Sequence, residues 1–349
     1  MGKNYTIFVN LKALLRKFLK YGRLRIFLRL LSYNMQMLFT FRKFHDIEND
    51  NIYDYKENIV PKRFFQRTSY FGNIMYGTEY QLKKYSGFKG RFRGYIEHGL
   101  YLGQAADEAV MFKSIFRNVL SFSEYREDRI RHYNPNMRCH VIGPYIHYAE
   151  AKSEEFITRE REKNGKTLLV FPVHSTDDID ADYNIVTIVN EINNIKNKYE
   201  FKSVLVCLYY RDILRGVNEY YEKAGFKVVC SGYKEDPLFL SRQKTFILLS
   251  DAVMANDIGT FLGYAIYLHK PVYLYANDDI KYSSNTVFSD TDSETIKRIK
   301  QDHNNEIIRE FSSFDMTISD KQYNICRYYW GFDHIKQPDQ IYNCLNSKH

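Results

Sequence analysis

The sequence predicts an α/β fold of two doubly wound, Rossmann-like domains that face each other across a cleft, with a basic amphipathic segment before them. The length of 349 residues suits about two domains. In the second half, apolar β-rich runs alternate with helical patterns. The excess of positive charge lies almost wholly in the first 45 residues. Each of these observations fixes one part of the predicted architecture.

The second half contains continuous apolar runs that are separated by single helical stretches. This pattern indicates a parallel sheet covered by helices on both faces. The predicted strands are Leu168–Val173, Ser203–Tyr209, Lys227–Cys230, Asp251–Ala255 and Pro271–Tyr275, and the predicted helices lie near 184–198, 213–224, 238–249, 259–268 and 292–311.

The first half fits a second α/β domain, with shorter strands. These are expected at Gly94–Ile96, Asn118–Phe122 and Cys139–Gly143, the last of which ends before Pro144. The polar stretch from Lys152 to Lys166 predicts a linker between the domains. The expected division is therefore a basic segment (1–45), an acceptor-side domain (46–150), a linker (151–166), a nucleotide-sugar-binding domain (167–315), and C-terminal helices that pack back across both domains (316–349).

The N-terminal segment carries ten basic side chains and no acidic one, whereas the whole chain has 50 basic and 42 acidic residues and a net charge of +8. Apolar residues recur between the cations at helical spacing, as in helices that lie on anionic membranes. The longest charge-free stretch, Leu30 to Phe41, is about eight residues shorter than the ~20 that span a bilayer. No cleavable signal peptide is recognisable. We expect a peripheral, membrane-surface segment; the alternative is a helix that packs on its own domain with solvated cations.

The remaining composition excludes other classes of protein. A hydrophobic content of 44% argues against disorder. The five cysteines are scattered and form no CxxC motif, which indicates a reducing, cytoplasmic compartment and neither disulfides nor a zinc site. No nucleic-acid-reading module accompanies the basic segment, so nucleic acid is not an expected partner.

Candidate ligand-binding residues follow the predicted strands of the second half. Ligands bind beyond the carboxyl ends of strands in open α/β sheets. Hydroxyls, an imidazole, a guanidinium and glycines gather at that edge. The candidates are His174, Ser175, Thr176, Arg211, Ser231, Gly232, Asn256, Gly259 and Thr260.

The turn that ends in Gly259 and Thr260 opens a predicted helix. A helix N-terminus favours an anion, and the Thr260 hydroxyl can donate to a phosphate oxygen. Arg211 suits a second phosphate contact because its guanidinium is bidentate and permanently charged. The alternative is an ordinary N-cap at Asn256 or Asp257, with a glycine that only permits close packing. Neither GxGxxG nor GxxxxGK[ST] occurs in the chain.

Glu97-His98-Gly99 at the end of a predicted strand is the candidate catalytic motif. A histidine beside a carboxylate can act as general base on a hydroxyl. The alternative is a structural histidine between the domains whose hydrogen bonds are satisfied, with Glu97 in a salt bridge. The acidic run Asp177, Asp178, Asp180 and Asp182 matches no metal-binding spacing and indicates a polar turn, so no metal site is expected.

Glu97-His98-Gly99, Asn256-Asp257-Ile258-Gly259-Thr260 and the later Lys270-Pro271-Val272 resemble segments of bacterial GT-B glycosyltransferases of surface polysaccharide synthesis, such as those of O-antigen and capsule. The resemblance extends over most of residues 90–345 at the level of the fold and is confined to these motifs in sequence.

The resemblance implies a nucleotide-sugar donor on the C-terminal domain, an acceptor entering from the N-terminal domain, and no obligatory metal. Gly259 and Thr260 would hold the donor phosphate, Ser231 and Gly232 would border the base or ribose, and His98 would be the acceptor base. The donor could be a UDP-sugar or CMP-sialic acid. A lipid-linked glycan would be the acceptor, at the inner face of the cytoplasmic membrane.

Three other functions remain open at this stage. A nucleotide-sugar 2-epimerase of the same fold would need paired carboxylates in the cleft and no membrane segment. A polyol-phosphate transferase would share the His-Gly motif and the membrane attachment. A non-catalytic membrane-associated partner would keep the fold and bind no nucleotide.

Overall fold

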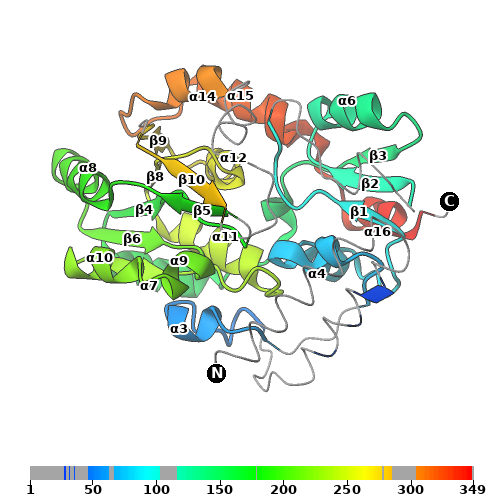
Figure 1. The fold of residues 1–349 in the computed structure, drawn as a ribbon, viewed down its shortest axis with the longest axis horizontal. Helices are drawn as coiled ribbons and strands as arrows, with labels where there is room; N and C mark the ends of the chain where they lie inside the picture. The colour runs from blue at the N-terminus through cyan, green and yellow to red at the C-terminus, as the bar shows by residue number, and fades with distance from the viewer. Residues whose placement is uncertain are drawn as a thin grey trace.

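Two parallel β-sheets form the framework of the computed structural model (Figure 1). The larger sheet has five strands in the order β7-β6-β4-β8-β9, all parallel. In chain order this is 3-2-1-4-5, the doubly wound arrangement, in which the winding direction reverses between β4 and β8. Its strands are β4 (Thr167–Phe171), β6 (Ser203–Cys207), β7 (Lys227–Val229), β8 (Ala252–Ala255) and β9 (Val272–Leu274). The structure describes residues 27, 28, 31, 35, 46–62, 67–102, 116–177, 179–276, 279–284 and 304–347.

The smaller sheet lies beside the larger one and has three parallel strands in sequential order. They are β1 (Gly94–Ile96), β2 (Asn118–Ser121) and β3 (Arg138–Val141). The two sheets confirm the predicted fold class of two parallel α/β units. Every strand of these sheets overlaps a predicted strand, and those of the larger sheet carry the apolar runs that a sheet covered on both faces requires.

The predicted strand at 168–173 ends earlier, at Phe171, because Pro172 has no N–H to donate to a neighbouring strand. The sequence analysis missed a two-stranded antiparallel ribbon of β5 (Ile179–Asp182) and β10 (Lys281–Ser284). Both of its strands are short, mix apolar with polar residues and lie outside the main sheet, so they lack the continuous apolar run used for the others.

The helices arise from apolar stripes and local caps. In α8, Ile188, Ile192 and Ile195 are buried on one face, and the Asn184 side chain accepts a hydrogen bond from the Thr187 N–H. The predicted linker at 151–166 is largely a helix, α7, capped by Ser153. The helices and 3₁₀ turns are α3 (Tyr55–Asn58), η1 (Phe71–Gly77), α4 (Thr78–Ser86), α6 (Glu124–Tyr133), η2 (Tyr145–Tyr148), α7 (Glu154–Asn164), α8 (Ile185–Lys198), α9 (Tyr210–Leu214), α10 (Asn218–Lys223), α11 (Phe239–Leu249), α12 (Thr260–Tyr267), α14 (Asn304–Phe311), α15 (Asp320–Trp330), η3 (Phe332–His334) and α16 (Pro338–Asn346).

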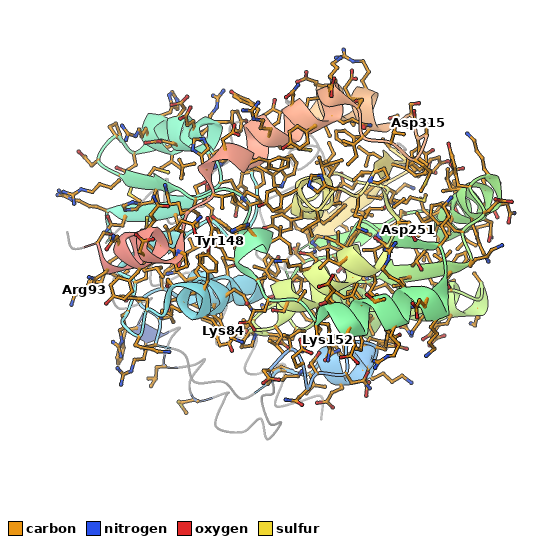
Figure 2. The ribbon with its side chains drawn as sticks, turned by 180° about the vertical axis from the view of Figure 1, so that it is seen from behind. Lys84, Arg93, Tyr148, Lys152, Asp251 and Asp315 are labelled. Carbon is orange, nitrogen blue, oxygen red and sulfur yellow. The ribbon has the colours of Figure 1, made fainter. Side chains whose placement is uncertain are left out.

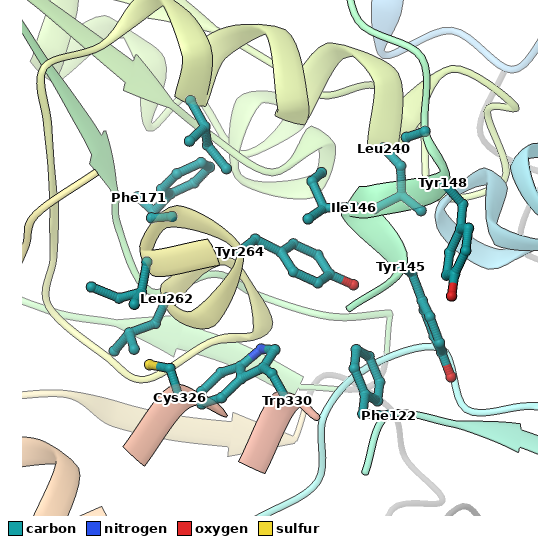
Figure 3. Close-up of a cluster of buried hydrophobic side chains, with 14 of the residues drawn as sticks. Phe122, Tyr145, Ile146, Tyr148, Phe171, Leu240, Leu262, Tyr264, Cys326 and Trp330 are labelled. Atoms are coloured by element: carbon teal, nitrogen blue, oxygen red, sulfur yellow. The ribbon is translucent and has the colours of Figure 1, made fainter. Parts of the chain in front are cut away.

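One hydrophobic core joins the two units (Figure 3). Phe122 and Tyr145 from the smaller unit stack with ring centroids 4.1 Å apart, and Tyr264 from α12 lies beside them. Trp330, at the end of α15, is fully buried against α12. Its indole N–H donates to the Thr260 carbonyl at 2.9 Å. The relative position of the two sheets is therefore set by close packing.

Gly263 makes the contact between α12 and Trp330 possible. A Cβ atom at this position would lie 2.1 Å from the indole Cδ2 of Trp330, well inside van der Waals contact. The helix can approach the ring only because this residue has no side chain.

Residues 46–62 lie against the larger unit, beneath α7 and α10 (Figure 1). A buried cluster of four charges holds this segment. Arg242 of α11 donates to Asp50 at 2.6 and 2.9 Å and to Asp236 at 2.9 Å, and Lys62 lies 3.2 Å from Asp50. Lys152, labelled in Figure 2, also donates to the Glu48 carbonyl at 2.6 Å. Paired in this way, the four buried charges balance one another.

The predicted basic segment at 1–45 lies outside the described residues, except for Phe27, Leu28, Leu31 and Met35, which are helical. In the part of the chain that the structure describes, no helix combines the length and the apolar character that a membrane crossing requires.

We expect Gly263→Ala to lower the free energy of unfolding by about 1–3 kcal/mol, because the added methyl group overpacks the contact with Trp330. Helix propensity alone predicts the opposite sign, a gain of about 1 kcal/mol. Urea denaturation measures the difference. In a Trp330→Leu background the same glycine-to-alanine change should cost less than it does in the wild type, because the clashing ring is gone. A stabilised single variant would contradict the packing argument.

Candidate functional site

A cavity of about 390 Å³ lies between the two units, beyond the carboxyl ends of the larger sheet. It opens at the point where the winding of that sheet reverses, between the loops that follow β4 and β8. This is where open α/β sheets bind their ligands. Loops after β1, β4, β6, β7 and β8 all contribute to its wall. The predicted candidates that line it are His98, His174, Thr176, Ser231, Gly259 and Thr260.

The loops after β4 and β8 are held together beneath the cavity. The Asn256 side-chain oxygen accepts the Val173 N–H at 2.6 Å. Asn256 is thus buried and does not line the cavity. The sequence analysis predicted that it contacts the donor, but its side chain joins two loops instead.

The α12 N-terminus faces the cavity with Gly259 as its N-cap, and no described side chain caps it. The alternative, a side-chain cap at Asn256 or Asp257, is therefore not what forms. The Thr260 hydroxyl accepts the Leu100 N–H at 3.0 Å, which brings the loop after β1 to this helix end. A hydroxyl that accepts one hydrogen bond still has its own proton to donate.

His98 lines the cavity from the smaller unit, as the sequence predicted for a residue at the end of β1. Its Nε2 lies 3.1 Å from the Tyr101 hydroxyl. Its ring centroid is 6.0 Å from that of Tyr76, which also reaches the cavity. His98 and the α12 N-terminus therefore border the same space from the two units.

Glu97 does not line the cavity, and this placement corrects the prediction of a catalytic role. Its carboxylate is fully buried and accepts two bonds from Arg126, at 2.7 and 3.1 Å, and one from Ser121 at 2.5 Å. Burial lowers the pKa of Arg126, but the Glu97 carboxylate outweighs this effect and raises it. Side chains alternate along an extended strand, so Glu97 points away from the face that carries His98.

Ser175 and Arg211 are two further corrections. Ser175 is fully buried, and its hydroxyl accepts from the Ala181 N–H at 3.1 Å and from Arg215 at 2.6 Å. Arg211 lies in α9, and its guanidinium is 3.5 Å from the Asp180 carboxylate. Because β6 ends at Cys207, Tyr209 occupies the wall where the sequence analysis placed Arg211.

Asp212, in α9, lies behind the loop after β4 and is 3% exposed. It accepts the Ser175 N–H at 3.2 Å. Burial raises the pKa of Asp212 to about 6, although the bond from Ser175 and the charges of Arg215 and Arg211 act in the opposite direction. This carboxylate therefore supports the loop at an electrostatic cost.

The last two candidates, Ser231 and Gly232, are neighbours in the loop after β7, but only one of them lines the cavity. Ser231 lines the cavity, and its carbonyl accepts from Arg242 at 3.0 Å. Gly232 lies outside the lining, with φ 122° and its N–H on the Cys230 sulfur at 3.3 Å. A side chain there would meet Arg242, so Gly232 permits the buried charge cluster rather than ligand contact.

The sequence analysis missed the aromatic wall of the cavity. The Tyr76 and Phe239 ring centroids are 4.8 Å apart, and the Tyr209 and His174 centroids are also 4.8 Å apart. Tyr76 adopts a left-handed backbone conformation, with φ 58°, and its N–H donates to the Lys234 carbonyl at 2.5 Å. A sequence signal existed only for Tyr209, which is the last residue of a predicted strand.

Asp257 was also missed as a cavity residue. Its carboxylate accepts the Tyr282 hydroxyl and the Ile258 N–H, each at 2.8 Å. Tyr282 comes from β10, so the antiparallel ribbon closes one side of the cavity. Among the described lining residues, Asp257 is the single carboxylate.

The acidic run after β4 is bound by cations of the chain itself. Asp177 pairs with Lys234, and Asp182 with Arg215 at 2.6 Å. Asp180 lies within 3.9 Å of both Arg211 and Arg215. In the described ranges, from which Asp178 is missing, no group of three or more metal-ligating side chains assembles.

Comparisons with known proteins give distant likenesses only. No family model matches the chain, and no curated protein matches it. Solved structures that resemble it include UDP-GlcNAc 2-epimerase from Neisseria meningitidis bound to UDP-GlcNAc (14% identity, TM-score 0.35, 77% of this chain and 71% of that chain). Others are sucrose-phosphate synthase from Thermosynechococcus elongatus (13%, 0.33, 76% and 68%) and a glycosyltransferase from Rickettsia africae (11%, 0.30, 83% and 79%). Likenesses with such low TM-scores carry no argument about function, and the fold rests on the strand order itself.

We expect Asp212→Asn to change how stability depends on pH. A carboxyl whose folded pKa is raised from 3.8 to about 6 binds more protons in the folded state between those values. Its contribution to stability is therefore present below pH 4 and is lost as the pH rises through 6, by up to about 3 kcal/mol. Urea denaturation from pH 4 to 8 should show this decline in the wild type. The variant, whose amide oxygen can still accept the Ser175 N–H, should lack it; parallel curves would contradict the assignment.

Proposed function

We propose that this protein is a GT-B-like glycosyltransferase that moves a sugar from a nucleotide-sugar donor to a lipid-linked glycan in bacterial surface polysaccharide synthesis. One observation carries the proposal. The cavity at the reversal of the larger sheet is bordered by the uncapped α12 N-terminus on one side and by His98 on the other. An anion-binding helix end and a candidate base thus share one space.

The donor phosphate would lie at Gly259 and Thr260, where backbone N–H groups and the Thr260 hydroxyl are available. The aromatic wall of Tyr76, Tyr209 and Phe239 would receive flat or apolar faces of the nucleotide, since such rings stack well on bases. Ser231 and His174 remain candidates for further donor contacts. A UDP-sugar and CMP-sialic acid both fit this chemistry.

The positions of His98 and the α12 N-terminus support the following transfer reaction. His98 takes the proton of the acceptor hydroxyl, whose oxygen forms a bond to the anomeric carbon of the donor sugar. The bond from that carbon to the phosphate oxygen breaks, and the nucleotide leaves with the electron pair. Negative charge develops on the leaving phosphate, where the α12 N-terminus and the Thr260 hydroxyl stabilise it. This scheme contains no obligatory metal ion.

Transfer suits the cavity better than 2-epimerisation. The epimerase hypothesis requires paired carboxylates, and the described lining supplies Asp257 alone. A polyol-phosphate transferase would bind a different nucleotide from the proposed glycosyltransferase, and a non-catalytic partner would bind none. A nucleotide-binding assay therefore distinguishes these hypotheses.

The membrane part of the proposal rests on three exposed apolar side chains. Phe27, Leu31 and Met35 are 60%, 44% and 52% exposed and lie four residues apart in helical backbone. This spacing places them on one helix face. The surrounding sequence to residue 45 is basic and free of acids. An apolar face amid cations suits an anionic membrane surface, and we therefore propose peripheral attachment at the cytoplasmic face.

We expect one of UDP, CMP and GDP to raise the melting temperature of the wild type, because a ligand that binds only the folded state stabilises it by mass action. Thr260→Val should lose most of this shift, whereas the matched Thr260→Ser, which keeps the hydroxyl, should retain it. His98→Ala should bind the nucleotide and lose about 10²–10⁴-fold in turnover. Differential scanning fluorimetry and a sugar-transfer assay measure the two effects. No response to any nucleotide would support the non-catalytic hypothesis.

We also expect the triple variant Phe27→Asp/Leu31→Asp/Met35→Asp to bind anionic vesicles at least about tenfold more weakly, because three apolar side chains no longer enter the interface. Cosedimentation with phosphatidylcholine–phosphatidylglycerol vesicles measures binding. Val186, Leu214 and Tyr220 are 66%, 68% and 57% exposed on the larger unit, so their triple Asp variant is a matched control. Equal loss in both variants would attribute the effect to charge alone.

A further inference from the structure

We propose that Arg126, a residue of α6 outside the cavity, positions His98 through the segment Glu97–Tyr101, which we name the His98 loop. This proposal rests on the function proposed above, in which His98 is the base. Arg126 is 0% exposed and is not part of the cavity lining. It is a positioning residue, since it acts on the cavity only through other side chains.

Arg126 holds both ends of the His98 loop. At the first end, its guanidinium donates to both carboxylate oxygens of Glu97, at 2.7 and 3.1 Å. At the other end, it donates to the Tyr101 carbonyl at 2.8 Å. The planar head of an arginine carries five donors in a fixed fork, so it can bind a carboxylate through two parallel hydrogen bonds and a carbonyl at the same time. The loop is therefore fixed at its start and its end by one side chain.

The link from Arg126 to His98 runs through Tyr101. The guanidinium carbon of Arg126 lies 5.4 Å from the centroid of the Tyr101 ring, within the range of cation–π attraction. The hydroxyl at the far end of that ring is 3.1 Å from His98 Nε2. The Tyr101 hydroxyl therefore orients the His98 imidazole, and Arg126 holds Tyr101 both at its backbone carbonyl and at the face of its ring.

The middle of the loop is fixed from the other unit. The Leu100 N–H donates to Thr260, whose carbonyl accepts the Trp330 indole N–H. The His98 loop is thus held at its two ends by Arg126 and near its middle, at Leu100, by Thr260 of the larger unit. A base must be held close to its working geometry, because small misplacements lower the rate steeply.

The test uses variants that avoid an unpaired buried charge. Glu97→Leu/Arg126→Met removes both charges together, which a core tolerates better than removal of one. Arg126→Lys keeps the charge but not the fork. Arg131→Met is the matched control, because Arg131 lies on the same helix and pairs with Glu127 at the surface. Tyr101→Phe removes the hydroxyl that contacts His98.

Two readouts need no substrate, so they remain valid if the proposed transferase activity fails. Hydrogen exchange of amides 98–102 should accelerate at least tenfold in the double variant and in Arg126→Lys, with Arg131→Met unchanged. In protein labelled with ¹³C-histidine, the His98 Cε1 signal, identified by its loss in His98→Gln, should move in Tyr101→Phe and in both Arg126 variants. Where turnover is measurable, kcat should fall with the donor KM unchanged.

Each outcome supports or overturns the positioning role. If the double variant does not fold, Arg126→Lys carries the test alone. A folded Arg126→Lys with wild-type exchange and an unmoved His98 signal would overturn the proposal. The proposal would also fail if Arg131→Met changed both readouts as strongly, because the effect would then belong to α6 as a whole.

Discussion

The burial of Trp330 between the two units is the contact on which the rest of the structure depends. Its ring fills the space left by Gly263, and its N–H binds the carbonyl of Thr260, the first residue of α12. The same threonine accepts the Leu100 N–H through its hydroxyl. Thr260 therefore bonds to the buried Trp330, begins the helix that faces the cavity and contacts the smaller unit. The cavity has its shape because this core is closely packed.

Close packing also sets the character of the site. The two walls of the cavity belong to different sheets, yet they share one hydrophobic cluster and direct hydrogen bonds. Leu100, Ile258 and Phe261, which line the cavity from both units, pack against that shared cluster. The strained backbone of Tyr76, a non-glycine residue with positive φ, persists in this setting because its N–H and its ring are both engaged.

The strands of the larger sheet could be predicted because a parallel sheet demands apolar residues on both faces, and the sequence supplies them in runs. The cavity could be located because strand ends converge at one edge. Which side chain of a loop enters the cavity could not be predicted, since it depends on where the strand stops: Tyr209 replaces Arg211 because β6 ends at Cys207. Ion pairs between residues far apart in the sequence could not be predicted either. Glu97 and Arg126 are 29 positions apart, and nothing local links them.

The buried charges around Arg242 have a consequence for the geometry of the protein at a surface. Asp50 is fixed to the larger unit, and Met35 precedes it by 15 residues, which span at most about 50 Å when fully extended. If the exposed side chains of Phe27, Leu31 and Met35 bind a membrane as proposed, the larger unit therefore stays within that distance of the surface. Under the proposed function, lipid-linked acceptors would then diffuse in two dimensions past the cavity, and the chain length between Met35 and Asp50 would set their effective concentration.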